Sequence, residues 1–211
     1  MDTMRPRTLQ LSLILISTVI APAAVLAQSE RELCAKATGD AALAACDKAI
    51  AANPKDADSF ANRGFTWSLK GDQDRAIADF NEALKINPTH ARALSNRGVA
   101  WNRKGEPEKA ISDSTEAIRI NKRYAKAYNN RGVALIRKKE LDKAIADLNE
   151  SIKLNPKDAS AYFNRGNALE MKGSLSDALS DFRTFAKLSP KDPDGPAAIA
   201  RLEGKIKAGG R

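Results

Sequence analysis

The sequence predicts an all-α protein built as a solenoid of stacked antiparallel helix pairs, and three observations support this fold class. The tripeptide Asn-Arg-Gly occurs four times, each copy 34 residues after the last, beginning at Asn62, Asn96, Asn130 and Asn164. Alanine, branched aliphatic and aspartate positions recur with the same step. Within a unit, small and apolar residues recur at helical spacing, and no alternating β pattern competes with them. A fixed step of this length is typical of stacked two-helix units.

Each unit is expected to hold two short amphipathic helices joined by a turn. In the first full unit, Phe60, Gly64 and Trp67 share one face of the first helix. Glycines that can adopt the positive φ that ends a helix follow the first helix at Gly71, Gly105 and Gly173. Prolines end the second helix, because the residue before proline is pushed out of the helical region, at Pro88, Pro156 and Pro190.

The N-terminus has the pattern of a secretory signal peptide. Two arginines precede an uncharged run from Leu9 to Ala21, and a stretch of small residues ends at Ala27. The run of 13 residues is shorter than the roughly 20 that a membrane-spanning helix needs. We therefore expect cleavage after Ala27 and a periplasmic or secreted protein. The alternative is an uncleaved anchor, since no charged residue occurs from Thr8 to Gln28, although Pro22 would break such a helix.

Composition narrows the function. The chain has 211 residues and a net charge of +9, from 35 Lys+Arg against 26 Asp+Glu. The basic excess is spread along the chain, which favours acidic partners or envelope surfaces and does not indicate nucleic acid. One histidine and two cysteines are too few for a four-ligand Cys/His zinc site, so no metal or cofactor is expected. His90 is expected in a surface loop without a nucleophile or paired carboxylates beside it, so we expect no enzyme.

Positions that recur every 34 residues form columns when the units are aligned. These columns resemble the pattern of the tetratricopeptide repeat (TPR) family, whose unit carries aromatic, Leu-Gly, aromatic, Ala, aromatic and Pro positions over 34 residues. The first full unit matches this pattern with Phe60, Gly64, Trp67, Ala76, Phe80 and Pro88. The second has Ser114 and Lys122 in place of an aromatic residue and the proline, and the third has Leu135 and Leu148 at aromatic positions. The resemblance implies a right-handed superhelix with full units at 57–90, 91–124, 125–158 and 159–192.

Arginine replaces the leucine that the family usually places before the glycine. Its aliphatic stem can pack along the helix pair while its guanidinium group seeks a counter-charge. An aspartate follows sixteen residues later in every unit, so we expect the pairs Arg63–Asp79, Arg97–Asp113, Arg131–Asp147 and Arg165–Asp181. The alternative is a row of four arginines that binds an anion.

The two ends of the array depart from the full unit. Residues 28–56 look like a shortened repeat in which Cys34 and Cys46 fall roughly level on an antiparallel hairpin. An exported protein would join them in a disulfide; the alternative is two buried free thiols. Residues 193–211 are expected to form a capping helix and a basic tail, with Ile199, Leu202 and Ile206 facing inward.

In the resembled family, the first helices line a concave face that holds peptide ligands. The groove positions carried over to this chain are Asn62, Phe65, Arg92, Asn96, Val99, Arg103, Lys126, Asn130, Val133, Ile136, Arg137, Phe163 and Asn164. Asparagine can donate to and accept from a peptide backbone, the apolar residues offer contact area, and the cations favour an acidic segment. Charge reversal at Arg103 and Arg137 is expected to abolish binding. The alternative is that the asparagines bridge neighbouring helices.

These inferences predict a non-enzymatic, exported scaffold that binds a protein or a peptide. The family's clamp for chaperone tails is not kept, because Ala61, Phe65 and Asn130 stand where that clamp needs other residues. Nucleic-acid binding is not expected, since Trp67 and Trp101 fall on core columns instead of a stacking surface. The alternative function is a peripheral cell-envelope protein, attached through its basic surface or an uncleaved N-terminus.

Overall fold

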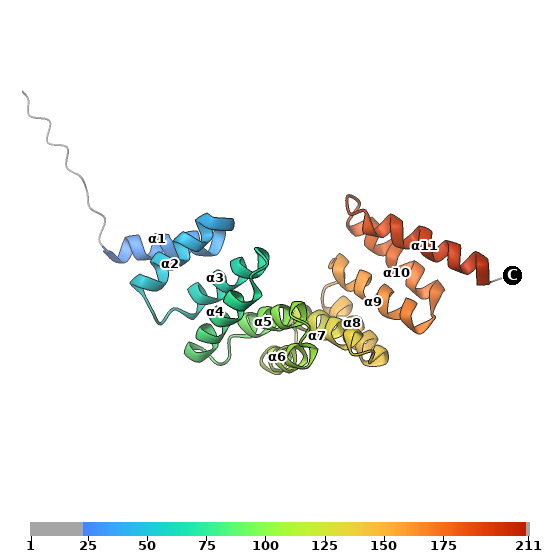
Figure 1. Cartoon of the computed structure of the whole chain (residues 1–211), viewed down its shortest axis with the longest axis horizontal. Helices are drawn as coiled ribbons and strands as arrows, with labels where there is room; N and C mark the ends of the chain where they lie inside the picture. Colours follow the sequence, from blue (N-terminus) through green and yellow to red (C-terminus); the bar gives the residue numbers. More distant parts are fainter. Residues whose placement is uncertain (1–22, 210–211) are drawn as a thin grey trace, which may run out of the picture.

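The computed structural model describes residues 23–209, and these residues form eleven α-helices and no strand. The helices are α1 (Ala23–Lys36), α2 (Gly39–Ala52), α3 (Ala57–Leu69), α4 (Gln73–Ile86), α5 (Ala91–Arg103), α6 (Pro107–Ile120), α7 (Ala125–Arg137), α8 (Leu141–Leu154), α9 (Ala159–Lys172), α10 (Leu175–Leu188) and α11 (Asp194–Gly209). They form the predicted all-α solenoid, which Figure 1 shows as an open arc. Most of the predicted signal peptide lies outside the described residues.

Successive helices pair along the chain, and the pairs stack in order. Each first helix packs on its own second helix, and each second helix packs on the first helix of the next pair. The first helices α1, α3, α5, α7 and α9 also pack against one another in sequence. Among the described helices, no two second helices of neighbouring pairs make a comparable contact. The first helices therefore lie on the inner side of the arc, where the elements are closest, and the second helices lie on the outer side.

The turn inside each pair has the same backbone geometry. Gly71, Gly105 and Gly173 adopt φ values of 88°, 81° and 87°, as the sequence predicts. In the third full pair, Lys139 occupies the equivalent place with a φ of 62°, the one non-glycine residue of positive φ among residues 23–209. A side chain in this region costs free energy because Cβ crowds the backbone. The α7–α8 turn therefore holds a strained residue where the other full pairs have glycine.

The predicted arginine–aspartate pairs are confirmed in every full unit. Arg63 Nε and Nη2 donate to the two carboxylate oxygens of Asp79 over 2.9 and 2.7 Å. The corresponding distances lie between 2.6 and 2.8 Å in the other three units. Each Nη1 also donates to the preceding second helix, at Asp47, Asn81, Thr115 or Asn149. Each arginine thus ties three helices together, which disfavours the alternative of a row free to bind an anion.

These ion pairs are partly buried, and their hydrogen bonds affect the charged state of the arginines. The bonds to Asp79, Asp147 and Asp181 raise the pKa values of Arg63, Arg131 and Arg165, although burial opposes the shift. The aspartate side chains are only 6 to 11% exposed. Because both oxygens of each aspartate accept hydrogen bonds from the arginine, these bonds offset most of the free-energy cost of burying the carboxylate charge.

In three of the four full pairs, the core is formed where the first helix presents glycine to a large side chain of the second helix. A Cβ added at Gly132 would lie 2.8 Å from Leu148 Cγ, and one at Gly166 would lie 2.9 Å from Phe182 Cε1. Leu148 and Phe182 are fully buried. In the second full pair the partner is Ser114, so the contact at Gly98 is looser, with 3.2 Å to Ser114 Oγ. The Ser114 hydroxyl is buried without a hydrogen-bond partner in the described part of the chain.

The N-terminal end is closed by a covalent link. Cys34 of α1 and Cys46 of α2 form a disulfide, with their Cα atoms 4.6 Å apart. Both cysteines are buried beside Ala45 and Ala49. The structure therefore contains the disulfide expected from the sequence, and not the alternative of two free thiols. Because the link closes a short loop in a terminal hairpin, it limits the unfolded chain where stacking neighbours are fewest.

The C-terminal end is closed by α11, which packs on α10. Ala198 and Leu202 are buried, and Ile199 packs against the same cluster. The prediction for Ile206 is wrong, because this side chain is 37% exposed. The last turn of α11 extends past the packed part of the helix, so Lys205, Ile206 and Lys207 all face solvent. Arg201 and Lys205 instead bind Glu170 of α9, and the bond from Arg201 lowers the pKa of Glu170.

Candidate functional site

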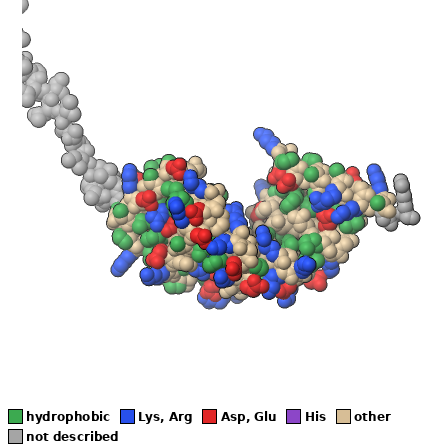
Figure 2. Space-filling model, in the orientation of Figure 1, with side chains coloured by type: hydrophobic (Ala, Val, Ile, Leu, Met, Phe, Trp, Pro, Cys, Tyr) green, Lys and Arg blue, Asp and Glu red, His purple; other side chains and the backbone are tan. Residues whose placement is uncertain are grey.

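The candidate site is the inner surface, which we define as the residues of α3, α5, α7 and α9 that face the opening of the arc. Figure 2 shows this opening as a hollow between the N-terminal and C-terminal helices, with Lys and Arg side chains near its floor. All thirteen predicted groove residues lie on these four first helices. The structure engages some of them in internal contacts and leaves others available.

The four asparagines that begin the Asn-Arg-Gly tripeptides fall into two groups, with and without a side-chain partner. Asn130 Nδ2 donates to Ser95 Oγ over 2.9 Å, and Asn164 Nδ2 donates to Asn129 Oδ1 over 3.0 Å. Both partners lie 35 residues earlier in the chain. For Asn96 the residue at that position is Ala61, which has no polar side chain. Asn130 and Asn164 thus bridge neighbouring first helices, while the side chains of Asn62 and Asn96 bond to no other described residue.

A further asparagine bond was missed at the sequence level. Asn102 of α5 is 5% exposed and its Nδ2 donates to the carbonyl oxygen of Asn130 over 3.3 Å. Its Oδ1 is buried without a partner among the described residues. A buried unpaired acceptor of this kind costs about 1–3 kcal/mol. Neighbouring first helices of the middle pairs are therefore joined by polar side chains on their inner sides.

The cations of the inner surface also differ in their partners. Arg92 pairs with Asp58 over 3.2 Å, and Arg103 Nη1 donates to the carbonyl oxygen of Ser68 over 2.8 Å. Lys126 and Arg137, at the two ends of α7, are exposed and form no ion pair or hydrogen bond with another described residue. Eleven residues of helix separate them by roughly 16 Å. Between them, Val133 and Ile136 are half-buried.

The apolar candidates are likewise split. Phe65 is 47% exposed, and its neighbour Leu69 is 63% exposed, so α3 presents apolar area to solvent. Val99 is half-buried on α5. The Phe163 ring instead packs against Phe182 and Phe185, with centroids 5.5 and 4.8 Å apart. Phe163 therefore contributes mainly to the core under α11.

His90 lies in the loop between α4 and α5, as expected, but the expectation that it is exposed at the surface is wrong. Its side chain is 11% exposed at the start of α5, where Nδ1 accepts from the backbone N–H of Ala93. Its Nε2 lies 3.1 Å from Asp58 Oδ1, which joins α5 to α3. Partial burial raises the pKa of Asp58, but the hydrogen bond from His90 and the nearby cations outweigh burial and lower it. His90 thus caps a helix and links two repeats.

Within residues 23–209, no group of three or more His, Cys, Asp or Glu side chains is arranged to hold a metal ion. None of the helices in this range combines the length and apolar character that a membrane span needs.

The chain resembles known proteins in sequence and in fold. A family model described as TPR repeat matches residues 69–105 and 134–173. The crystal structure of MamA is 29% identical with a TM-score of 0.61, and the match covers 72% of this chain and 89% of that chain. TTC0263, a thermophilic TPR protein of Thermus thermophilus, is 23% identical with a TM-score of 0.70, covering 85% and 98%.

A third similar structure is that of YrrB, described as a TPR protein with an unusual peptide-binding site. It is 22% identical with a TM-score of 0.61, and the match covers 83% of this chain and 87% of that chain. No curated protein sequence matches the chain.

Proposed function

Because this chain belongs to the tetratricopeptide repeat family, we propose that it is a non-enzymatic scaffold that binds a protein or peptide partner along its inner surface. TPR proteins are generally interaction modules, and YrrB is one of similar fold with a peptide-binding site. The stacked pairs supply a rigid support, since every full unit is tied by a bidentate arginine–aspartate pair. The inner surface is then a preformed site that needs little ordering when a ligand binds.

The observation that carries this proposal is the pair of unpartnered cations on α7. Lys126 and Arg137 are exposed on either side of half-buried Val133 and Ile136. An exposed charge without a counter-ion gains from an acidic partner, and adjacent apolar area gains from being covered. The occupant that fits is a segment of the partner that carries carboxylates about 16 Å apart and apolar residues between them.

Exposed apolar area on α3 extends the same surface. Phe65 and Leu69 face solvent two helix pairs further toward the N-terminus than α7, and the side-chain amides of Asn62 and Asn96 bond to no other described residue. These groups suit an extended ligand whose apolar side chains follow its acidic part. Asn130, Asn164 and Phe163 serve this site indirectly, because their own contacts hold α5, α7, α9 and α10 in place.

Charge reversal on α7 tests this proposal. We would capture partners from an envelope extract with the wild type and with Lys126→Glu/Arg137→Glu, then measure the affinity of each purified partner by calorimetry. The control Lys85→Glu/Lys187→Glu makes the same charge change on the second helices α4 and α10. Loss of at least about tenfold in affinity for the α7 variant alone supports the inner surface. Equal affinity for all three proteins contradicts it.

Arg103 needs a separate variant, since it binds Ser68 as well as facing the inner surface. Arg103→Glu would remove that bond and could loosen α3 from α5, whereas Arg103→Gln keeps a donor. A ligand that contacts the Arg103 charge binds more weakly to Arg103→Gln, while the melting temperature stays close to that of the wild type. Weaker binding to the glutamate variant together with a lower melting temperature would point to a structural role.

We further propose that the protein is exported to the periplasm or secreted after cleavage following Ala27. The disulfide between Cys34 and Cys46 supports this, because such links persist in oxidising compartments. The cleavage point lies within α1, so the mature helix would begin near Gln28 and keep Cys34. Intact-mass measurement on protein from the envelope fraction tests cleavage, and a salt wash separates peripheral from integral association. A retained Met1 in salt-resistant membranes would instead support an anchor.

A further inference from the structure

One repeat column changes character halfway along the solenoid. At the position near the end of each first helix, 34 residues apart, the chain has Trp67, Trp101, Leu135 and Leu169. In the first two full pairs, the indole side chains pack against a core cluster that includes Ile77 and Phe80. The two leucines are smaller side chains in the same setting.

A cation covers each indole ring. Arg75 Cζ lies 4.5 Å from the centroid of Trp67, and Lys109 Nζ lies 4.5 Å from the centroid of Trp101. Lys109 is also 3.4 Å from Glu106, so an ion pair with the residue that precedes the second helix accompanies the stacking. The first two units therefore show what this setting accepts: a flat aromatic ring with a cation over its face.

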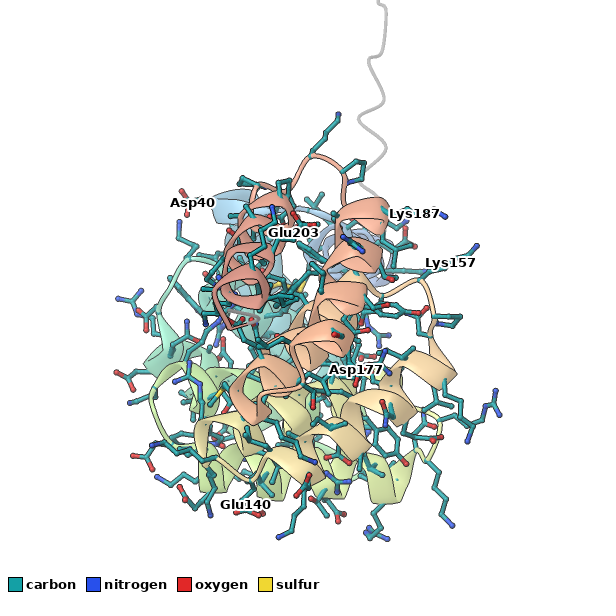
Figure 3. The ribbon with its side chains drawn as sticks, turned by 90° about the vertical axis from the view of Figure 1, so that its right-hand side faces the viewer. Asp40, Glu140, Lys157, Asp177, Lys187 and Glu203 are labelled. Carbon is teal, nitrogen blue, oxygen red and sulfur yellow. A yellow bond between two sulfur atoms is a disulfide. The ribbon has the colours of Figure 1, made fainter. Side chains whose placement is uncertain are left out.

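Where leucine replaces tryptophan, an open cleft remains. The cleft at Leu135, which we call the outer cleft, has a volume of about 440 Å³. Ile111 of α6, Leu135 of α7 and Ala146 of α8 form its apolar lining. Polar side chains line the rest of it, among them Lys138, Glu140 and Lys143. Figure 3 labels Glu140 at the bottom of the view, on the outer side of the arc. The volume lies within the range of about 300–1,000 Å³ of small-molecule sites.

The outer cleft keeps the polar groups that accompany tryptophan in the preceding unit. Lys143 is the counterpart of Lys109, and Glu140 is the counterpart of Glu106. Lys143 Nζ lies 2.7 Å from Glu140 Oε2. Since Lys109 holds the same ion pair while covering Trp101, Lys143 can cover a ring in the outer cleft without giving up Glu140. The outer cleft thus has the cation, Lys143, but has Leu135 in place of the indole that Lys109 covers one repeat earlier.

The next cleft along the solenoid lacks this combination. It lies at Leu169, has a volume of about 300 Å³ and is lined by Asp177, which replaces the lysine. A carboxylate repels the negative face of an aromatic ring, and no cation stands in its place. The two clefts therefore provide a useful comparison, because both lie at the same repeat position and contain the leucine, but one is lined by Lys143 and the other by Asp177.

We propose that the outer cleft binds an exposed tryptophan side chain of a partner protein. The indole takes the place that Trp101 fills one repeat earlier, with Ile111 and Leu135 beneath it and Lys143 over its face. An aromatic side chain seated in a pocket is the usual anchor of a protein interface. This site lies on the outer side of the arc, so it is separate from the inner surface and does not depend on what binds there.

The direct test is a titration of the methyl-labelled full chain with N-acetyl-tryptophanamide, followed by NMR. We expect saturable shifts at the methyl groups of Ile111 and Leu135, and NOEs between the indole and Leu135. N-acetyl-leucinamide serves as the apolar control and should bind at least about threefold more weakly, because it gains no contact with the cation. Absence of saturable shifts at both methyl groups overturns the proposal, as does equal binding of the two probes.

Variants separate the cleft from general apolar binding. Leu135→Trp should fill the cleft and abolish the shift of Ile111, whereas the control Leu169→Trp should leave it unchanged. Lys143→Ala should weaken binding about two- to fivefold. If Leu135→Trp does not fold, the NOEs of the wild type decide. A different set of results would show that a second copy of this chain occupies the cleft: the wild type self-associates, Leu135→Trp prevents the association, and the probe does not bind. In that case the proposal is wrong.

Discussion

The pairs α3–α4 and α5–α6 differ from α7–α8 and α9–α10 on the outer side of the arc, although all four share the same skeleton. Each has the glycine, the arginine and the aspartate, and each arginine makes the same bonds. The first two pairs fill their outer sides with Trp67 and Trp101, while the last two leave clefts at Leu135 and Leu169. In this solenoid, buried columns maintain the stacking, and one further column determines whether the outer side is closed or open.

The largest expected effect comes from making the first half resemble the second. Trp101→Leu should remove buried ring contacts with the core beside Ile77 and lower stability by about 2 kcal/mol. Urea unfolding followed by circular dichroism measures the loss, with Trp101→Phe as a control that keeps an aromatic ring and loses less. Wild-type stability in Trp101→Leu would show that the indole does not support the first half.

The glycine column should show the next largest difference. Gly132→Ala places a methyl group 2.8 Å from Leu148 Cγ, so the buried leucine must move, at a cost of about 1–2 kcal/mol. Gly98→Ala meets only looser contacts at Ser114 and Ala110, and the gain in helix propensity offsets them to within about 0.5 kcal/mol. Thermal unfolding of the two variants side by side checks this order, and a larger loss for Gly98→Ala would reverse it.

Filling the outer cleft should stabilise the second half. Leu135→Trp buries additional apolar area and places a ring under Lys143, for a gain of about 1 kcal/mol. Leu169→Trp should gain less, because Asp177 stands where a cation would cover the ring. Differential scanning calorimetry of both variants gives the comparison. A lower melting temperature for Leu135→Trp than for Leu169→Trp would mean that the cleft does not accept an indole.

The smallest effect concerns the α7–α8 turn. Lys139 has a φ of 62° where the other full pairs have glycine. Relief of that conformation is worth about 1–2 kcal/mol, and the greater freedom of unfolded glycine offsets about 0.5–1 kcal/mol of it. Lys139→Gly should therefore raise stability by about 0.5 kcal/mol in urea unfolding, with Lys139→Ala as a control that keeps the strain. Equal stability of the glycine and alanine variants would contradict this reasoning.

Much of the fold could be predicted from the sequence because the 34-residue step applies the same constraint several times. The Arg63–Asp79 pair and its counterparts follow from two columns that keep a fixed separation in every unit. The glycine turns follow from a backbone conformation that glycine adopts most easily. At these positions, the residue type that the local sequence shows is enough to predict its contact or conformation in the folded protein.

The site could be predicted less fully, since its chemistry depends on neighbours that one column does not specify. Asn130 and Asn96 share a column, yet only Asn130 has a polar side chain 35 residues earlier. The burial of His90 could not be predicted from the local sequence, because its contact with Asp58 joins two different repeats. The outer cleft was missed because three helices line it. Its signal in the sequence was the change from tryptophan to leucine while the lysine eight residues later remained.

The most direct test of this account is a reciprocal exchange, Trp101→Leu/Leu135→Trp, titrated with N-acetyl-tryptophanamide and followed at isoleucine methyl groups. The exchange keeps the composition and moves the predicted opening by one repeat, to a position beside Ile77 and Lys109. We predict that the saturable shift at Ile111 disappears and that one appears at Ile77, 34 residues earlier. A folded exchange variant that still binds the probe at Ile111, or binds it nowhere, would contradict the claim that this column opens and closes the outer side.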